Sequence, residues 1–206
     1  MRKMKENELG QIADQMLAIF FDEVDVSNVT KGINPDTAKK IIRESLYADM
    51  KYSHKYGDVF VADDEMSGIA VLIDGKKFSV IKKTLMSLKS NKIITKAATK
   101  EELKILNSNA RKVQEAHSFN WYKKRDNVPF YLAHIGVDKN KRGTGICTEM
   151  MDFIFDYTKK YNTELALETF SDSNASMYKH FGFEVVEIVE SKDKQIKQYR
   201  MLKKLE

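Results

Sequence analysis

The chain has 206 residues, of which 42% are hydrophobic and 32% are charged. This balance excludes a disordered or fibrous protein, and the two prolines and nine glycines leave little room for flexible linkers. We therefore expect a single domain over residues 1–206. The net charge of +5 favours anionic ligands in general and does not by itself indicate nucleic acid.

The one cysteine, Cys147, excludes an internal disulfide framework and a CxxC metal site, so no metal is expected. The first residues are basic but lack the apolar core of a signal peptide. The early apolar run Met16 to Phe21 is too short to span a bilayer. These features predict a cytoplasmic protein without a membrane partner.

The first half of the chain begins with two predicted helices. Residues 8–21 carry apolar side chains at three- and four-residue spacing, which is typical of one helix face. Asn34 followed by Pro35 predicts the start of a second helix, since asparagine caps helices and proline fits the first turn. The stripe of the first helix consists of Leu9, Ile12, Ala13, Met16, Leu17 and Phe20.

A hairpin and a lysine-rich segment follow. GDVFVAD and SGIAVLI, residues 57–63 and 67–73, predict two antiparallel strands. Thr99 and Glu102 form a capping-box pattern for a later helix. Lysines recur through residues 76–100, with only one aromatic side chain among them. Nucleic-acid binding would need interleaved aromatics, so we expect a solvated helical face.

The second half is more regular. Its order of strand, helix, strand, helix and two strands predicts an α/β (α+β) fold, in which a mixed sheet carries helices on both faces. The predicted strands are residues 129–137, 164–169, 183–190 and 195–204, and the predicted helices are residues 143–161 and 173–181.

The turn between the strand 129–137 and the next helix predicts an anion site. The first amides of a helix lack internal partners, and the helix dipole adds partial positive charge. Gly143 and Gly145 let an anion approach the backbone, and Arg142 adds charge-assisted hydrogen bonds. A Walker A loop is excluded because Gly145 is not followed by Lys and Ser or Thr. A dinucleotide fingerprint is weak because residue 148 is threonine.

Two motifs together resemble one family. Arg142-x-x-Gly145-x-Cys147, after Ile135-Gly136-Val137, resembles the acyl-CoA pyrophosphate turn of the GNAT acetyltransferase superfamily. Downstream, LETFSDSNASMYKHFGFEVVE is similar to the second half of that signature. The resemblance covers residues 129–187 and extends more weakly to the hairpin. Cys147 departs from the usual glycine or alanine.

The resemblance implies a GNAT fold with a mostly antiparallel central sheet. It divides the chain into N-terminal helices and hairpin (1–75), the lysine-rich helical segment (76–124) and an acetyl-CoA-binding core (129–206). It implies an acetyl-CoA-dependent N-acetyltransferase whose primary amine acceptor, more often a small molecule than a protein, attacks the thioester directly. The alternative is a degenerate acyl-CoA-binding domain acting as sensor or scaffold. A homodimer is compatible with either.

The resemblance also implies roles for the coenzyme-binding residues. The main chain from Ile135 through Gly136 to Val137 pairs with the pantetheine arm. Asn174 hydrogen-bonds that arm, and the Tyr178 hydroxyl protonates the departing thiolate. Asn174 and Tyr178 share a helix face at i,i+4 spacing. The amides that hold the pyrophosphate are those of Arg142, Gly143, Thr144, Gly145, Ile146 and Cys147.

Three residues are candidates for the general base: Glu168, His134 and His117. Glu168 comes first because it ends a strand beside the cleft, although a solvated strand end would look the same. His134 titrates in the right range, but strand alternation predicts that it points away from the face of Tyr131, Ala133 and Ile135. His117 lies near the end of the preceding helix. Taken alone, Tyr178 is also compatible with a core aromatic, and Asn174 with a helix cap.

Overall fold

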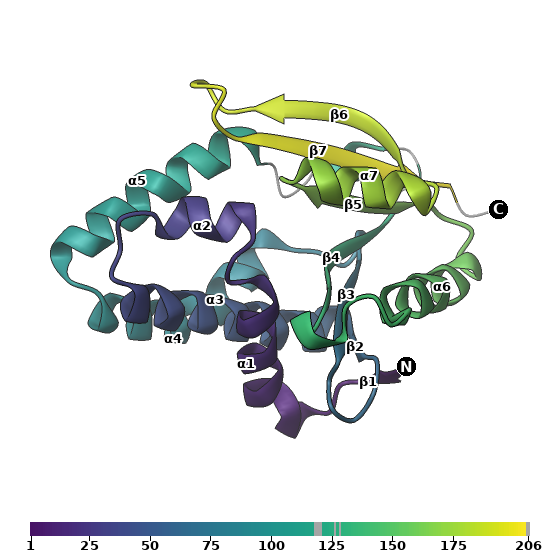
Figure 1. Ribbon diagram of the computed structural model, residues 1–206, viewed down its shortest axis with the longest axis horizontal. Helices are drawn as coiled ribbons and strands as arrows, with labels where there is room; N and C mark the ends of the chain where they lie inside the picture. The colour runs from purple at the N-terminus through teal and green to yellow at the C-terminus, as the bar shows by residue number, and fades with distance from the viewer. Residues whose placement is uncertain (118–120, 126, 128, 205–206) are drawn as a thin grey trace.

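One seven-stranded sheet organises the computed structural model, which describes residues 1–117, 121–125, 127 and 129–204 (Figure 1). The strand order is β1-β2-β3-β4-β5-β7-β6. All neighbours are antiparallel except β4 and β5, which confirms the predicted mixed, mostly antiparallel sheet. The strands are β1 (Arg2–Lys3), β2 (Asp58–Val61), β3 (Gly68–Asp74), β4 (Phe130–Val137), β5 (Leu165–Thr169), β6 (Glu184–Glu190) and β7 (Lys197–Lys203).

The helices begin where the sequence places caps. The Asn34 side chain accepts hydrogen bonds from the amides of Asp36 and Thr37, and Thr99 and Glu102 form the predicted capping box. Within the described residues, no helix is both long enough and apolar enough to cross a membrane. The helices are α1 (Leu9–Phe20), α2 (Val24–Thr30), α3 (Pro35–Tyr56), α4 (Val80–Ala97), α5 (Lys100–Ala116), α6 (Ile146–Lys159) and α7 (Asp172–His180).

The two faces of the sheet bury separate apolar cores because strand residues alternate between them. Val59 and Val61 of β2 pack with α1 and α3, whereas Phe60 between them packs with residues of α6 and α7. In Figure 1, α2 to α5 lie together on one side of the molecule and α6 on the other. Helices therefore cover both faces, as predicted.

Several boundaries differ from the prediction. The helix expected from Gly143 begins only at Ile146, because Gly143 and Gly145 have φ angles of +79° and +92°, which a right-handed helix excludes. Strand β1 and helix α2 were not predicted. Residues 118–120 of the lysine-rich segment and 205–206 of the predicted core lie outside the described residues.

The lysine-rich segment is helical, as expected. Helix α4 buries only Ser90 among its side chains. Its outer face is not purely solvated lysine, because Ile81, Leu85 and Leu88 are exposed there as well. Helix α4 packs against α3, and α5 against α2, which places this segment beside the N-terminal helices.

Candidate active site

The parallel strands β4 and β5 pair only at their beginnings. Phe130 pairs with Leu165 and Tyr131 with Ala166. Beyond Tyr131, no strand of the described part of the chain covers the edge of β4 that faces β5. A cavity of about 830 Å³ opens there, lined by β4, the start of α6, the end of β5 and α7. Its size is that of a small-molecule site. The uncovered edge of β4 leaves main-chain groups available to an extended ligand.

The turn between β4 and α6 forms one end of this cavity. Gly145 is the N-cap of α6 and supplies no side chain to the first amides of the helix. A Cβ atom at Gly143 or Gly145 would meet nothing within 4 Å, so the space above the turn is open. Arg142 and Lys141 line the same end. Positive side chains and uncapped amides around open space fit a phosphate group.

The other residues of the turn differ in whether they line the cavity. Ile146 and Cys147 line the cavity, and burial raises the pKa of the Cys147 thiol, which keeps it neutral. Thr144 is not among the described lining residues, and its hydroxyl donates to the carbonyl of Lys141 at 2.7 Å. Thr148, which the sequence did not single out, lines the cavity instead.

Helix α7 presents two of the predicted residues to the cavity. Its N-cap is Ser171, whose hydroxyl accepts a hydrogen bond from the main-chain amide of Asn174. The alternative that Asn174 is itself the cap is therefore wrong. The Asn174 side chain lines the cavity and donates to Glu23 Oε2 at 3.5 Å. Tyr178 also lines it, although only 8% of the residue is exposed. Burial raises the pKa of Tyr178 far above its ordinary value, so the phenol stays protonated.

Glu168 and His117 meet at the β5 end of the cavity. The Glu168 side chain is only 4% exposed, so its interpretation as a solvated strand end is wrong. Glu168 Oε2 lies 3.0 Å from His117 Nδ1 and accepts from Gln198 Nε2 at 2.8 Å. Its other oxygen, Oε1, is buried without a hydrogen-bond partner among the described residues. This carboxylate is therefore only partly satisfied by the protein.

The orientation predicted for His134 is wrong. The register between β3 and β4 shifts, so that Leu132 pairs with Leu72 but His134 pairs with Val71, leaving Ala133 as an extra residue. Such a bulge interrupts the alternation of side chains. His134 therefore lies on the same face as Tyr131, where its ring is 5.6 Å from that of Phe20. It lines the cavity, as Tyr131 does.

The N-terminal helices add charged residues that the sequence did not indicate. Asp49 of α3 lies 3.0 Å from Lys83 Nζ and 3.9 Å from His134 Nε2. Burial opposes ionisation of Asp49, but Lys83 and His134 outweigh it and lower the pKa of the carboxyl to about 2. Glu23 and Asp25, at the start of α2, also line the cavity. No motif surrounds any of these residues, because they come from separate elements.

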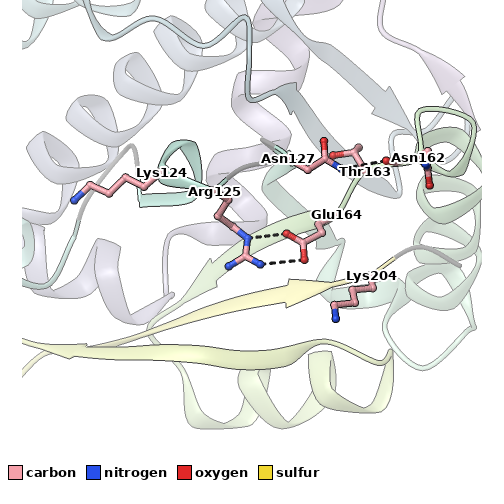
Figure 2. A pocket seen from close by; sticks show the side chains of 7 residues that line it. All are labelled: Lys124, Arg125, Asn127, Asn162, Thr163, Glu164 and Lys204. Atoms are coloured by element: carbon pink, nitrogen blue, oxygen red, sulfur yellow. Dashed lines mark hydrogen bonds and ion pairs between the residues drawn. The ribbon is translucent and has the colours of Figure 1, made fainter.

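A second cavity, of about 590 Å³, lies at the other end of β5 (Figure 2). There Arg125 donates to both carboxylate oxygens of Glu164, at 2.6 and 3.1 Å. Asn127 Nδ2 donates to the carbonyl of Asn162 at 3.1 Å. The ion pair neutralises its own charges, and among the described residues none of the predicted site residues lines this cavity. We therefore place the candidate active site at the β4–β5 opening.

Replacing Gly145 with alanine should destabilise the protein. The left-handed φ of +92° costs a residue with a Cβ atom about 1–2 kcal/mol, although space for the methyl group is present. Gly10 provides the matched control, because it lies in α1 with nothing within 4 Å of an added Cβ. There alanine should raise the unfolding free energy by about 0.5–1 kcal/mol. Urea unfolding measures both changes in unfolding free energy. Changes of the same sign in the two variants would contradict this account of the turn.

Comparisons with known proteins identify the family of the chain. A sequence profile described as acetyltransferase (GNAT) domain matches residues 90–205. An uncharacterized N-acetyltransferase from Schizosaccharomyces pombe is 22% identical over 189 residues, which is 88% of this chain and 73% of the relative. The two chains are thus similar over most of their lengths.

Solved structures show the same fold. One described as histone acetyltransferase HPA2 and related acetyltransferase, from Corynebacterium glutamicum, has a TM-score of 0.66 at 16% identity, covering 100% of this chain and 95% of that chain. An N-acetyltransferase from Staphylococcus aureus has a TM-score of 0.56 at 15% identity, covering 98% of both chains. Because the family profile matches more than half of the sequence, the chain belongs to the GNAT acetyltransferase family and is an acyltransferase of the N-acetyltransferase type.

Proposed function

We propose that this protein is an acetyl-CoA-dependent N-acetyltransferase that transfers the acetyl group to a primary amine of a small molecule. The observation that carries the proposal is a single cavity that joins the uncovered edge of β4, the uncapped start of α6 and the buried side chains of Tyr178 and Glu168. One end suits a diphosphate and the middle suits an extended arm. The remaining end carries groups able to exchange protons.

The residues that would hold the coenzyme follow from this arrangement. The main chain of Ile135, Gly136 and Val137 offers hydrogen bonds to the pantetheine arm, since no strand formed by the described residues covers that edge of β4. Asn174 lies on α7 beside the same opening and donates to the arm. Charge-assisted hydrogen bonds hold the pyrophosphate. Their donors are Arg142 and the amides of Gly143, Thr144, Gly145, Ile146 and Cys147.

Two side chains move protons during the transfer. The acceptor nitrogen attacks the thioester carbonyl, the C–N bond forms, and the C–S bond breaks. Tyr178, held neutral by burial, gives its phenolic proton to the leaving thiolate. Glu168 receives the proton that the ammonium group of the acceptor must lose before it attacks. The nitrogen loses a second proton once the C–N bond has formed, and that proton replaces the one given up by Tyr178. Acetyl-CoA and the ammonium form of the acceptor thus become CoA, amide and one released proton, which leaves through Glu168.

Glu168 suits the role of base better than either histidine. The Glu168 carboxylate has one oxygen, Oε1, without a hydrogen-bond partner among the described residues, and this oxygen can accept a proton. His134 instead faces the Asp49 carboxylate, which already forms an ion pair with Lys83. His117 contacts Glu168 Oε2 and so orients the carboxylate. We propose His117 as a positioning residue and His134 as part of the acceptor wall.

Acetyl-CoA binding tests this function first. Acetyl-CoA at 100 times its dissociation constant should add about 2.7 kcal/mol to the unfolding free energy. For a domain of this size, that corresponds to a rise in Tm of roughly 5–10 °C. S-acetyl-pantetheine, which lacks the diphosphate, should give a much smaller rise at the same concentration. Differential scanning fluorimetry provides the measurement, and an equal response to both compounds would contradict a diphosphate site at the α6 turn.

A free-thiol release assay over a panel of amines separates the enzyme from a degenerate domain that acts as sensor or scaffold. Thiol release with at least one amine supports the enzyme. Stabilisation by acetyl-CoA without thiol release from any amine would support the sensor instead. The buried, cavity-lining positions of Tyr178 and Glu168 favour the enzyme.

A further inference from the structure

The charge of the lining side chains changes sign along the cavity. At the α6 turn its charged lining residues are the cations Lys141 and Arg142. At the other end and over the side of α2 and α3, among the described lining residues, four carboxylates face a single lysine, Lys83. The four carboxylates are Glu23, Asp25, Asp49 and Glu168. The coenzyme occupies the positive end under the proposed function, so the negative end is left for the acceptor.

Two of the carboxylates already contact a basic side chain of the protein. Asp49 forms an ion pair with Lys83 at 3.0 Å, and Glu168 lies 3.0 Å from His117. Glu168 still has one oxygen, Oε1, that is buried without a hydrogen-bond partner among the described residues. An acceptor with one ammonium group therefore meets one incompletely satisfied carboxylate at the reaction centre.

The other two carboxylates have no cationic partner among the described residues. Among the described residues, the Glu23 carboxylate contacts the neutral side-chain amide of Asn174 at 3.5 Å. No ion pair joins Glu23 or Asp25 to a described lysine, arginine or histidine. Both residues are half-buried at the start of α2. Burial is the main cause that raises the pKa of Tyr178 and of Tyr131, and the negative charges of Glu23 and Asp25, respectively, add to it. They therefore stand within electrostatic reach of the reaction centre.

The wall between these charges is apolar. Its side chains suit methylene groups, because they offer dispersion contacts and no hydrogen bonds. Aromatic faces among them also attract cations. These wall residues are Ile19, Phe20, Val24, Ile73, Phe78 and Phe170.

We propose that the acceptor is an aliphatic diamine or polyamine. One amino group loses its proton to Glu168 and is acetylated, while a second, which stays an ammonium ion, binds Glu23 and Asp25. Alkyl ammonium groups resemble that of lysine, with a pKa near 10.4, so the second group is charged at neutral pH. The alkyl segment between the two groups lies along the apolar wall. This inference rests on the proposed function and specifies its acceptor.

Pairs of amines of equal length test the proposal. Thiol release is measured with 1,5-diaminopentane and with 5-amino-1-pentanol, which replaces the second ammonium by a hydroxyl. The diamine should have a kcat/KM at least roughly tenfold higher, because one charged hydrogen bond is worth about that factor. The preference should appear mainly in KM and shrink at high ionic strength. Equal kcat/KM for both compounds would overturn the proposal.

Two variants and a control locate the preference. In Asp25→Asn and Glu23→Gln, the ratio of kcat/KM for the diamine to that for the amino alcohol should fall by roughly tenfold. Asp152→Asn removes the same charge from an exposed position of α6 and should leave the ratio unchanged. Ratios unchanged in both cavity variants would overturn the assignment of these carboxylates.

Different results would contradict the proposed function and the proposed acceptor. If acetyl-CoA neither raises Tm nor releases thiol with any amine, the proposed function is wrong. If acetyl-CoA binds but no amine in the panel is acetylated, stabilisation of the CoA-saturated protein is compared between spermidine and 1-aminopentane. Stabilisation by spermidine alone would support a polyamine site in a domain that acts as a sensor, and equal responses would overturn the polyamine assignment as well.

Discussion

Replacing Tyr178 with phenylalanine is expected to lower kcat by about 10²- to 10⁴-fold, the usual contribution of a positioned proton donor. The phenyl ring keeps the edge-on contact with Phe183, whose ring centroid lies 5.9 Å away. Coenzyme binding should therefore be nearly unchanged. Burial raises the pKa of Tyr178, so the donor stays protonated through mildly alkaline pH. The wild-type kcat should accordingly show no loss from Tyr178 ionisation below about pH 10, the ordinary pKa of tyrosine.

Single-turnover thiol release and isothermal titration with CoA measure the two effects separately. Tyr161→Phe is the matched control, since Tyr161 is 51% exposed and lies outside the lining of the cavity. The control should change neither quantity. A Tyr178→Phe enzyme with wild-type kcat would remove Tyr178 from the mechanism. A variant that loses CoA affinity and kcat together would assign Tyr178 to binding.

The sequence predicted those features that depend on a few neighbouring residues. Asn34 caps α3, and Thr99 with Glu102 caps α5, because each cap joins atoms three residues apart or fewer. The turn at Gly143 and Gly145 was recognisable for the same reason, since the glycines themselves permit the positive φ angles. The α6 end of the candidate site, where we propose that the coenzyme binds, was therefore recognisable from a short stretch of chain.

The acceptor half was not predictable from local patterns. His134 was predicted on the wrong face because of the bulge at Ala133. This bulge depends on how β4 pairs with β3, and the residues of β4 alone do not indicate it. Asp49 reaches the cavity through the packing of α3, and Asp25 through α2, a helix that was not predicted. Each of these carboxylates, seen in the sequence alone, is indistinguishable from a solvated surface charge.

Replacing the proposed general base, Glu168, is expected to have the second large effect on catalysis. Glu168→Gln should lower kcat/KM by about 10²- to 10³-fold at neutral pH, since general-base catalysis contributes on this scale. The substitution keeps the shape of the side chain, and its amide oxygen can still accept from Gln198 Nε2, which now lies 2.8 Å from Glu168 Oε2. The fold should therefore survive. Steady-state thiol release at saturating acetyl-CoA measures the loss.

The pH profile distinguishes a base from a structural residue. Without Glu168, the acceptor must arrive already deprotonated, so kcat/KM of the variant should rise about tenfold per pH unit below the amine pKa near 10.4. The wild-type profile should be flatter, because the carboxylate takes up the proton within the complex. Glu164→Gln, at the opposite end of β5 in an ion pair with Arg125, should keep the wild-type profile. Parallel profiles for Glu168→Gln and wild type would mean that Glu168 holds the cavity wall through His117 and Gln198, and that another group accepts the proton.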